Sequence, residues 1–487
     1  MKTMLCSRRH MLHTSAFGLS SVAASWLLKR DGLLAEEAGI PVKPELEQKT
    51  YDLLPKQPHH NSKAKAMISM FMLGGPSQID LFDPKPELIK HNGKSFTGDI
   101  KFDNPAQASR EIMAPLWNFK PHGQCGMELS ELVPHLGSIA DDITLIRSMH
   151  TGANNHGPSN YALNTGKANS GRAVLGSWLT SALGSETQEL PSYVALTDTR
   201  GLPLLGGENW SNGKLPSIYQ GTVIRPVAPR IFNLDPPRHL KGDPQAEQLQ
   251  LLSKLNQEYI REHPGENDLD ARMQSYGLAA RMQVAAREAF EISNESAATK
   301  KMYGIDQKVT RDYGTRCLIA RRLVERGVRF VQIPCNGQVW DHHGSIKTAL
   351  PQRCAEIDKP AAALVRDLKE RGLLDSTIVH WGGEMGRLPV IQFRDGLTKR
   401  ETVGRDHNTY GFSMWVAGGG FQKGYIHGQT DEFSHYAVDG IVHHYDWLAT
   451  VLNQFGLDHK KLKFRVGPRD LRLVENPEAR IATELLG

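Results

Sequence analysis

The sequence predicts an α/β protein whose mainly parallel β-sheet is covered by helices on both faces. Two observations lead to this class: short continuous apolar runs recur along the chain, and segments with helical periodicity separate several of them. A strand that is apolar along its whole length is buried on both sides, which requires a layer of helices on each face of the sheet. The strand-like runs are residues 67–73, 143–146, 193–196, 328–333, 377–380 and 413–417.

Turn and helix signals indicate where these predicted strands begin and end. A Gly-Gly-Pro turn at residues 74–76 ends the first run. Residues 361–371 carry Leu364 and Leu368 on one helix face, and Gly372 ends this helix before the next run begins. Because the carboxyl ends of parallel strands lie at one edge of a sheet, we expect the ligand site at that edge.

Two long helical patterns, residues 245–262 and 269–293, interrupt the alternation of strand and helix. Apolar residues recur at helical spacing in the second pattern, which is typical of core packing rather than of a cofactor site. We therefore predict one α/β domain over residues 67–487 with a helical insertion at about 244–301. The recurring apolar residues are Leu278, Met282, Ala285 and Ala289.

The first thirty-five residues have the order of regions found in an export signal. An Arg-Arg pair precedes a moderately apolar run at residues 14–28, and small residues follow as far as Ala35. This order resembles a twin-arginine signal, a route that exports folded proteins. We expect a signal peptide over residues 1–35, a linker arm over residues 36–66, and a protein that works in the periplasm or outside the cell.

The composition argues against nucleic-acid binding and against a membrane-spanning helix in the mature protein. The 58 Lys and Arg residues are scattered among 53 Asp and Glu residues, so the net charge of +5 comes without the basic runs typical of nucleic-acid binding. After the signal, no stretch reaches the roughly 20 apolar residues that a membrane-spanning helix needs. The cysteines have no Cys-x-x-Cys spacing, so disulfides and free thiols both remain open, as does the oligomeric state.

Carboxylate and imidazole side chains stand close to the ends of four strand-like runs, where a parallel sheet presents side chains to a ligand. A mixture of the two suits zinc, manganese or iron, whereas an all-oxygen set favours calcium or magnesium. We expect one or two divalent metal ions, with zinc favoured over calcium or manganese, and ligand atoms within about 5 Å of a common centre. The predicted metal ligands are Asp80, Asp341, His343, Glu384 and His407.

The most specific motif is His-Gly-Pro-Ser-Asn-Tyr-Ala-Leu-Asn-Thr-Gly at residues 156–166. It resembles the sulfatase signature, which runs Cys-x-Pro-Ser-Arg through three residues to Leu-Thr-Gly. In sulfatases the leading Cys becomes the formylglycine nucleophile at a helix N-terminus, where free N–H groups help to bind the anionic ester. Here His156 takes the position of the Cys and Asn160 that of the Arg, so the usual sulfatase nucleophile cannot form.

Longer strings extend the resemblance from about Met67 to the C-terminus. The chain resembles the alkaline phosphatase and sulfatase superfamily, and more closely an exported bacterial family catalogued as domain of unknown function fifteen-oh-one. The strings that carry this resemblance are GGPSQIDLFDPKP, NHGPSNYALNTG, GRAVLGSWLTSALGSE, WDHHG, GGEMGRLP, GRDHN and HHYDWLATVLNQFGLDH.

Carried over by position, the resemblance implies a metal site. Asp80 corresponds to the metal ligand after the first strand, and Asp341 with His343 corresponds to the Asp-plus-His pair of one zinc site. His407 falls where the last His ligand follows. Glu384 falls where many relatives have Asp followed by His, but here a methionine follows it, which is a poor ligand and weakens or removes the second metal site.

The implied activity is hydrolysis of a phosphate or sulfate ester, with sulfated or phosphorylated polysaccharide as one substrate class. His156 would be a metal ligand, a general acid or a nucleophile, and Arg387 or Arg405 would hold an anionic oxygen of the ester. The alternative is a non-catalytic binding or structural envelope protein that keeps the fold after losing the nucleophile.

Overall fold

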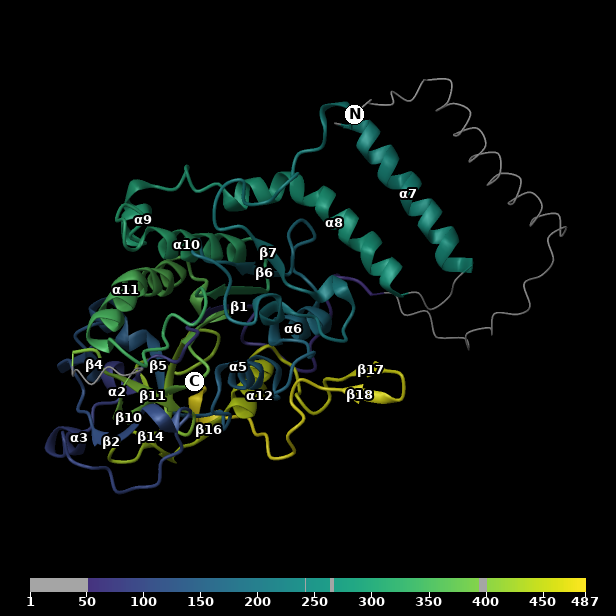
Figure 1. Ribbon diagram of the computed structural model, residues 1–487. Helices are drawn as coiled ribbons and strands as arrows, with labels where there is room; N and C mark the ends of the chain where they lie inside the picture. Colours follow the sequence, from purple (N-terminus) through teal and green to yellow (C-terminus); the bar gives the residue numbers. More distant parts are fainter. Residues whose placement is uncertain (1–50, 241, 263–266, 394–400) are drawn as a thin grey trace, which may run out of the picture. The chain divides into compact units, whose positions relative to one another are not determined.

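A computed structural model describes residues 51–240, 242–262, 267–393 and 401–487 (Figure 1). The predicted signal peptide and the first part of the predicted linker arm lie outside these residues. From Tyr51 onward the chain lies along the folded body: the Lys56 N–H donates to the Leu183 carbonyl at 3.0 Å, and Leu53 is buried. None of the helices described is both long and apolar enough to span a membrane.

The central sheet has nine strands in the order β13-β5-β12-β9-β1-β8-β6-β7, and β16 also pairs with β5. All of its pairs are parallel except the two made by β12. All six predicted strands are present, so the predicted α/β class with a mainly parallel sheet is confirmed. The strands are β1 (Ala66–Phe71), β5 (Ile143–His150), β6 (Tyr193–Leu196), β7 (Thr222–Ile224), β8 (Phe330–Pro334), β9 (Thr377–Gly382), β12 (Phe412–Ala417), β13 (Tyr425–His427) and β16 (Val442–His443).

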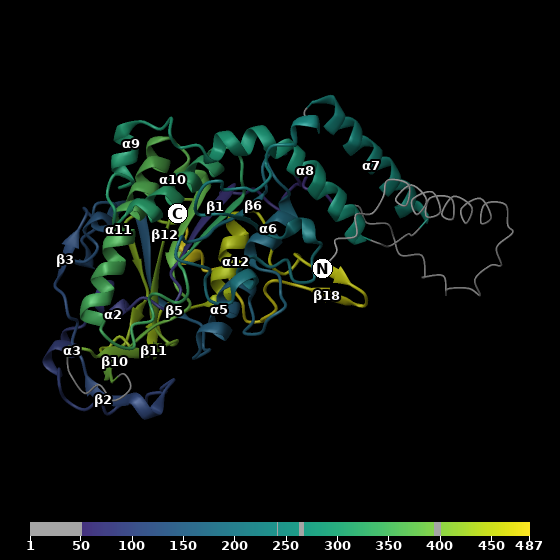
Figure 2. The same cartoon turned by 45° about the horizontal axis from the view of Figure 1, so that its top comes forward.

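Helices cover both faces of this sheet, with α11 on one side and α12 on the other (Figures 1 and 2). Strand β1 shows why both layers are needed. Ile68 and Met70 join one apolar cluster together with α10 and α11, whereas Met67 and Phe71 join a second cluster with α6 and α12. The main helices are α5 (His156–Thr165), α6 (Leu175–Leu183), α10 (Arg311–Glu325), α11 (Ile346–Glu370) and α12 (His444–Gln454).

A small antiparallel sheet of three strands lies next to the carboxyl edge of the central sheet and carries several of the predicted site residues. Its strands are β2 (Ala108–Ile112), β10 (Gly386–Gln392) and β11 (Gly404–Asn408), in the order β11-β10-β2. Two-stranded pairs and short helices complete the body: β3 (Phe119–His122) with β4 (Met127–Ser130), β14 (Gln429–Thr430) with β15 (Ala437–Asp439), β17 (Phe464–Val466) with β18 (Arg469–Leu471), α2 (Gln78–Leu81), α3 (Pro86–Lys90) and α4 (Pro134–Gly137).

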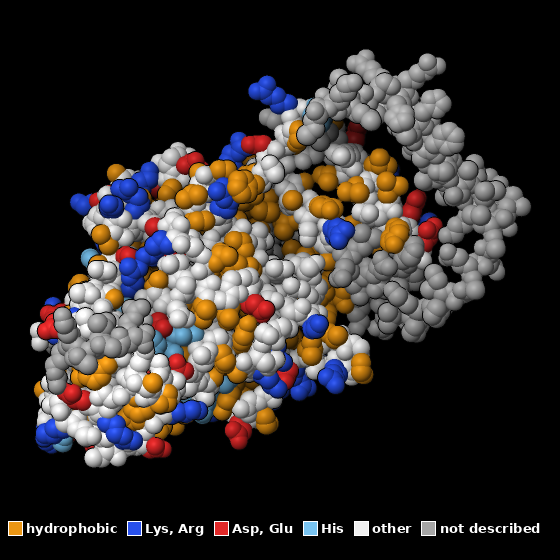
Figure 3. Space-filling model, in the orientation of Figure 1, with side chains coloured by type: hydrophobic (Ala, Val, Ile, Leu, Met, Phe, Trp, Pro, Cys, Tyr) orange, Lys and Arg blue, Asp and Glu red, His pale blue; other side chains and the backbone are white. Residues whose placement is uncertain are grey.

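The segment predicted as an insertion contains α7 (Asp243–Glu262), α8 (Asn267–Phe290) and α9 (Ala297–Met302). Met282 and Ala289 of α8 are buried in the apolar cluster that includes α10, as their helical spacing predicts. Figure 3 shows hydrophobic side chains on the surface over α7 and α8. Leu255 and Tyr276 of these two helices are exposed.

The glycine turn after β1 is packed directly against the loop that carries Asp341. Gly74 has a φ of +110°, and a Cβ atom there would lie 2.5 Å from the Asp341 nitrogen and 2.6 Å from the Gln338 carbonyl oxygen. These neighbours are backbone atoms, so they cannot rotate away as a flexible side chain would. Only glycine allows β1 and the Asp341 loop to approach this closely.

We therefore predict that Gly74→Ala destabilises the fold more than Gly372→Ala does. Gly372 also has a positive φ, +69°, but a Cβ there would meet no atom within 4 Å. Backbone strain alone costs about 1–2 kcal/mol, whereas Gly74→Ala adds a clash with two backbone segments. Urea unfolding midpoints of the two variants measure the difference, and equal midpoints would contradict the close packing at Gly74.

Candidate metal centre

Four polar side chains from distant parts of the chain meet at the carboxyl edge of the central sheet. The ligand atoms they offer all lie within 4.8 Å of one another. Three of the four were predicted as metal ligands, and the fourth is the histidine at the sulfatase nucleophile position. The four residues, named here the histidine–aspartate cluster, are His156, Asp341, His343 and His407.

One carboxylate oxygen lies at the middle of this cluster. Asp341 Oδ1 is 2.9 Å from Nε2 of His343 and 3.3 Å from Nε2 of both His156 and His407. Ligand atoms that lie about 2.0–2.2 Å from a tetrahedral ion are about 3.3–3.6 Å apart, so these separations are close to those of a coordinated set. Imidazole with carboxylate is also a donor mixture that suits zinc and other transition metals. The residues present therefore fit a divalent metal ion.

Local structure explains how three of these side chains reach this place. His156 is the first residue of α5, whose N-cap Asn155 accepts a hydrogen bond from the Gly157 N–H at 3.2 Å. Asp341 follows β8, and its loop is held by the hydrogen bond from the Trp340 N–H to the Leu73 carbonyl. His407 lies on β11 of the small sheet, where it pairs with Arg387 of β10.

Two of the three histidines also have a side-chain partner at their other ring nitrogen. Nδ1 of His156 is 2.6 Å from Oε1 of Glu384, and Nδ1 of His343 contacts Oε1 of Gln392. Metal-binding histidines in proteins commonly make this second contact, because it fixes the orientation of the ring and which nitrogen carries the proton. Glu384, predicted as a ligand, thus contacts the cluster through His156.

Burial and charge set the protonation of the cluster. Burial lowers the pKa of His156, but hydrogen bonds to Asp341 and Glu384 outweigh burial and raise the pKa to about 9. Burial raises the pKa of Asp341, but the charge of Arg387 and the hydrogen bonds of the three histidines hold it well below the usual range. Burial lowers the pKa of His407. Without a metal, His156 therefore holds a proton that a metal ion would displace.

Asp80 lies outside this cluster, because other groups take both of its carboxylate oxygens. Arg405 Nε donates to Asp80 Oδ2 at 2.9 Å, and the Ser77 hydroxyl donates to the same oxygen at 2.6 Å. The Leu116 N–H donates to Oδ1 at 3.1 Å. Asp80 and Arg405 are both fully buried and form an ion pair with each other.

The two arginines predicted to hold the ester are both fully buried and donate to protein oxygens. Arg387 donates to Asp341 Oδ1 at 2.7 Å and to the Gly75 carbonyl at 2.9 Å. Arg405 donates to the carbonyls of Met113 and Ala114, each at 2.9 Å, in addition to Asp80. Both guanidinium groups therefore connect the backbone segments and carboxylates that surround the cluster.

Sequence reasoning missed Gln392 as a contact of His343. Gln392 ends a strand that the apolar runs did not predict, and no motif marks it.

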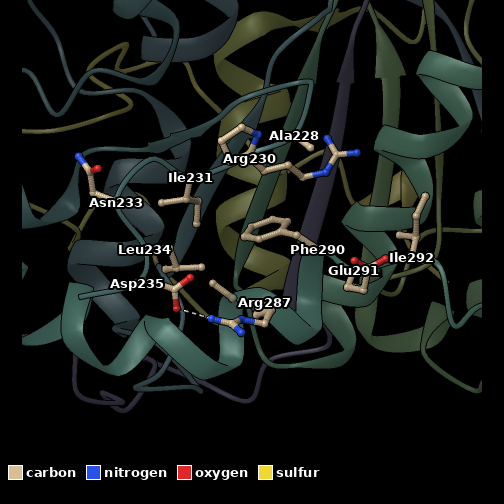
Figure 4. A pocket seen from close by; sticks show the side chains of 12 residues that line it. Ala228, Arg230, Ile231, Asn233, Leu234, Asp235, Arg287, Phe290, Glu291 and Ile292 are labelled. Carbon is tan, nitrogen blue, oxygen red and sulfur yellow. Dashed lines mark hydrogen bonds and ion pairs between the residues drawn. The ribbon is translucent and has the colours of Figure 1, made fainter. Parts of the chain in front are cut away.

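The cavity in Figure 4, about 500 Å³ in volume, lies away from the cluster. It is lined by residues 228–231 and 233–235 and by the C-terminal end of α8, where Arg287 pairs with Asp235.

Several solved structures are similar to this chain. The sulfatase PsFucS1 from Pseudoalteromonas sp. matches with 14% identity and a TM-score of 0.31 over 67% of this chain and 62% of its own length. The phosphonate monoester hydrolase SpPMH from Silicibacter pomeroyi matches with 10% identity and a TM-score of 0.29 over 66% of this chain and 68% of its own. TAB5 alkaline phosphatase matches with 10% identity and a TM-score of 0.33 over 82% of this chain and 100% of its own.

The chain thus spans about three fifths of the length of PsFucS1. A search of curated protein sequences finds no match. Comparison with known protein families matches residues 64–486, which include the whole histidine–aspartate cluster. The chain belongs to the family described as Protein of unknown function (DUF1501).

Proposed function

We propose that this protein is an exported hydrolase of phosphate or sulfate esters that depends on one divalent metal ion. The observation that carries this proposal is the convergence of three imidazole nitrogens and one carboxylate oxygen at the carboxyl edge of the sheet. The donor types favour zinc. The proposed ligands are His156, Asp341, His343 and His407.

When bound, the metal would supply a Lewis acid that neutralises charge on the ester oxygens. The rest of the chemistry comes from the protein itself. The ester would lie at the N-terminus of α5, where the helix dipole favours an anion. Glu384 contacts His156, and Arg387 donates to Asp341. These contacts hold the two side chains in place. An anionic ester of a polysaccharide is the substrate class that we propose.

The contacts of His156 favour a ligand over a nucleophile. Its Nδ1 is bound to Glu384 at 2.6 Å, and its Nε2 faces Asp341 at 3.3 Å. A nucleophilic nitrogen needs a lone pair directed at the substrate, but both ring nitrogens are directed at carboxylates. We therefore propose that His156, at the position of the sulfatase Cys, serves as a metal ligand and not as a nucleophile.

A second candidate function is a non-catalytic metal-binding protein of the cell envelope. The specific observation is that the cluster offers four protein ligands, which complete a tetrahedral ion and leave no open position. The buried, fully engaged Arg387 and Arg405 also leave neither guanidinium free to hold an ester. Zinc with four protein ligands can still accept a fifth ligand, so hydrolysis of an ester, and not metal identity, separates the two candidates.

We predict that the purified protein holds about one zinc ion per chain and hydrolyses aryl phosphate or aryl sulfate esters. His156→Ala and His343→Ala should each lower zinc affinity by more than about 100-fold and abolish hydrolysis, because each removes a proposed ligand. Metal analysis and a chromogenic ester assay measure both effects. His60→Ala, an exposed histidine, is the matched control and should change neither.

Bound zinc without hydrolysis of either ester would support the second candidate. The absence of bound metal from the wild-type protein would contradict both candidates, since each requires the same ligands.

We predict opposite effects of pH on zinc affinity and on the stability of the metal-free protein. The pKa of His156 is about 9 in the folded chain and near 6.5 in the unfolded chain. The bound proton therefore stabilises the fold fully below pH 6.5, and up to roughly 3 kcal/mol of this stability is lost as the pH rises to about 9. Zinc affinity should rise about tenfold per pH unit over the same interval, because zinc displaces the proton.

Denaturant unfolding of the metal-free protein and zinc titration at several pH values test this prediction. His156→Gln removes the titrating group, so the variant should lose the fall in stability with pH. An unchanged pH dependence in this variant would show that another group holds the proton.

A further inference from the structure

The third histidine of the cluster differs from the other two at its outer nitrogen. Nδ1 of His407 has no hydrogen-bond partner among the described residues, although the residue is only 2% exposed. A buried polar atom without a partner destabilises the folded protein. His156 and His343 avoid this cost through the side chains of Glu384 and Gln392. His407 therefore needs an acceptor of its own.

The carboxylate of Asp103 faces this nitrogen, with Oδ2 at 3.7 Å from Nδ1 of His407. Its backbone is held nearby, because the N–H groups of Asp103 and Asn104 donate to Asp406 Oδ2 at 3.1 and 3.4 Å. Its side chain is 31% exposed. A shift of about 1 Å would bring the carboxylate into hydrogen-bond distance of His407.

Asp406 cannot take this role. Its Oδ2 accepts the two backbone N–H groups of Asp103 and Asn104, and its Oδ1 accepts the His407 N–H at 2.8 Å. Asp406 therefore ties residues 103–104 to β11 by backbone contacts and leaves the His407 ring to another acceptor.

The same short segment also supports a second histidine of the cluster. Gln107 lies four residues after Asp103, and its Oε1 accepts a hydrogen bond from Nε2 of Gln392 at 3.4 Å. The other end of the Gln392 amide, Oε1, contacts Nδ1 of His343. Residues 103–107 thus face His407 directly, through Asp103, and His343 indirectly, through Gln392. In the sequence they are about 300 positions away from Asp406.

We infer that Asp103 is a positioning residue of the metal centre, whose carboxylate accepts the Nδ1–H of His407 and directs the Nε2 lone pair at the metal. A neutral imidazole has one N–H group, and a carboxylate at Nδ1 selects the form that carries the proton there. This inference rests on the metal centre of the proposed function. It adds an exposed loop residue to the groups on which metal affinity depends.

The same geometry has a competing interpretation. Asp103, Asp406 and His407 offer ligand atoms within 4.8 Å of one another, a spacing that a second cation also requires. Two ions that share His407 would need its imidazole to lose both protons. The hydrogen bond needs no such loss, so we favour it.

The experiment compares zinc binding by the full-length metal-free protein and its variants, in competition with a chromogenic chelator. Asp103→Ala should lower zinc affinity roughly 10–100-fold, and Asp103→Asn should lower it less, because the amide oxygen still accepts a hydrogen bond. Asp99→Ala, an exposed acidic residue of the same loop, is the matched control and should bind zinc like the wild type.

Thermal unfolding without zinc provides a readout that separates positioning from a structural role. Asp103→Ala should lower the melting temperature more in the presence of zinc than in its absence, because the loss of zinc affinity adds to the loss of the hydrogen bond. Wild-type zinc affinity in Asp103→Ala, or an equal loss of melting temperature with and without zinc, would overturn the inference.

The number of bound ions separates the remaining outcomes. Two zinc ions in the wild type and one in Asp103→Ala would establish the second cation and overturn the positioning role. A wild-type protein that binds no zinc would overturn the proposed metal centre and this inference together. Zinc binding that is insensitive to Asp103 would overturn the inference alone.

Discussion

The structure of the site depends on the largely buried charge of Asp341, whose side chain is 12% exposed. A carboxylate removed from water costs several kcal/mol unless cations or hydrogen bonds compensate for it. Asp341 obtains this compensation from Arg387 at 2.7 Å and from the three imidazoles of the cluster. Because these partners come from α5, β10, β11 and the loop after β8, one charge sets how four segments approach one another.

The Asp80–Arg405 pair repeats this arrangement next to the cluster. Arg405 and His407 lie two residues apart on β11, so their side chains project from the same face of the strand. One binds Asp80 and the other joins Asp341. The small sheet thus supplies a cation to one carboxylate and an imidazole to the other, and the β1 turn packs against the Asp341 loop only because Gly74 has no side chain.

A bound metal ion would also contribute to the stability of the folded protein. The cluster combines residues from four segments, and in the unfolded chain these ligands are far apart. A metal would therefore bind the folded chain and contribute its binding energy to folding. The described cysteines are all free thiols in this structure, so disulfides do not provide that stabilisation among the described residues.

The sequence by itself determined the class of the fold, the six core strands and the edge of the sheet that holds the polar side chains. Apolar runs and glycine turns are local signals, and local signals suffice for strands and their ends. They also place Asp341, His343 and His407 near one edge. The tertiary structure alone decided which carboxylate joins the imidazoles.

Asp80 and Glu384 satisfy the same sequence criterion as Asp341, yet Arg405 binds one and His156 contacts the other. Asp103 meets no sequence criterion and nevertheless faces His407. The physical reason is distance: a carboxylate pairs with whatever cation or N–H group lies within a few ångströms, and that neighbour is set by the packing of loops far apart in the chain.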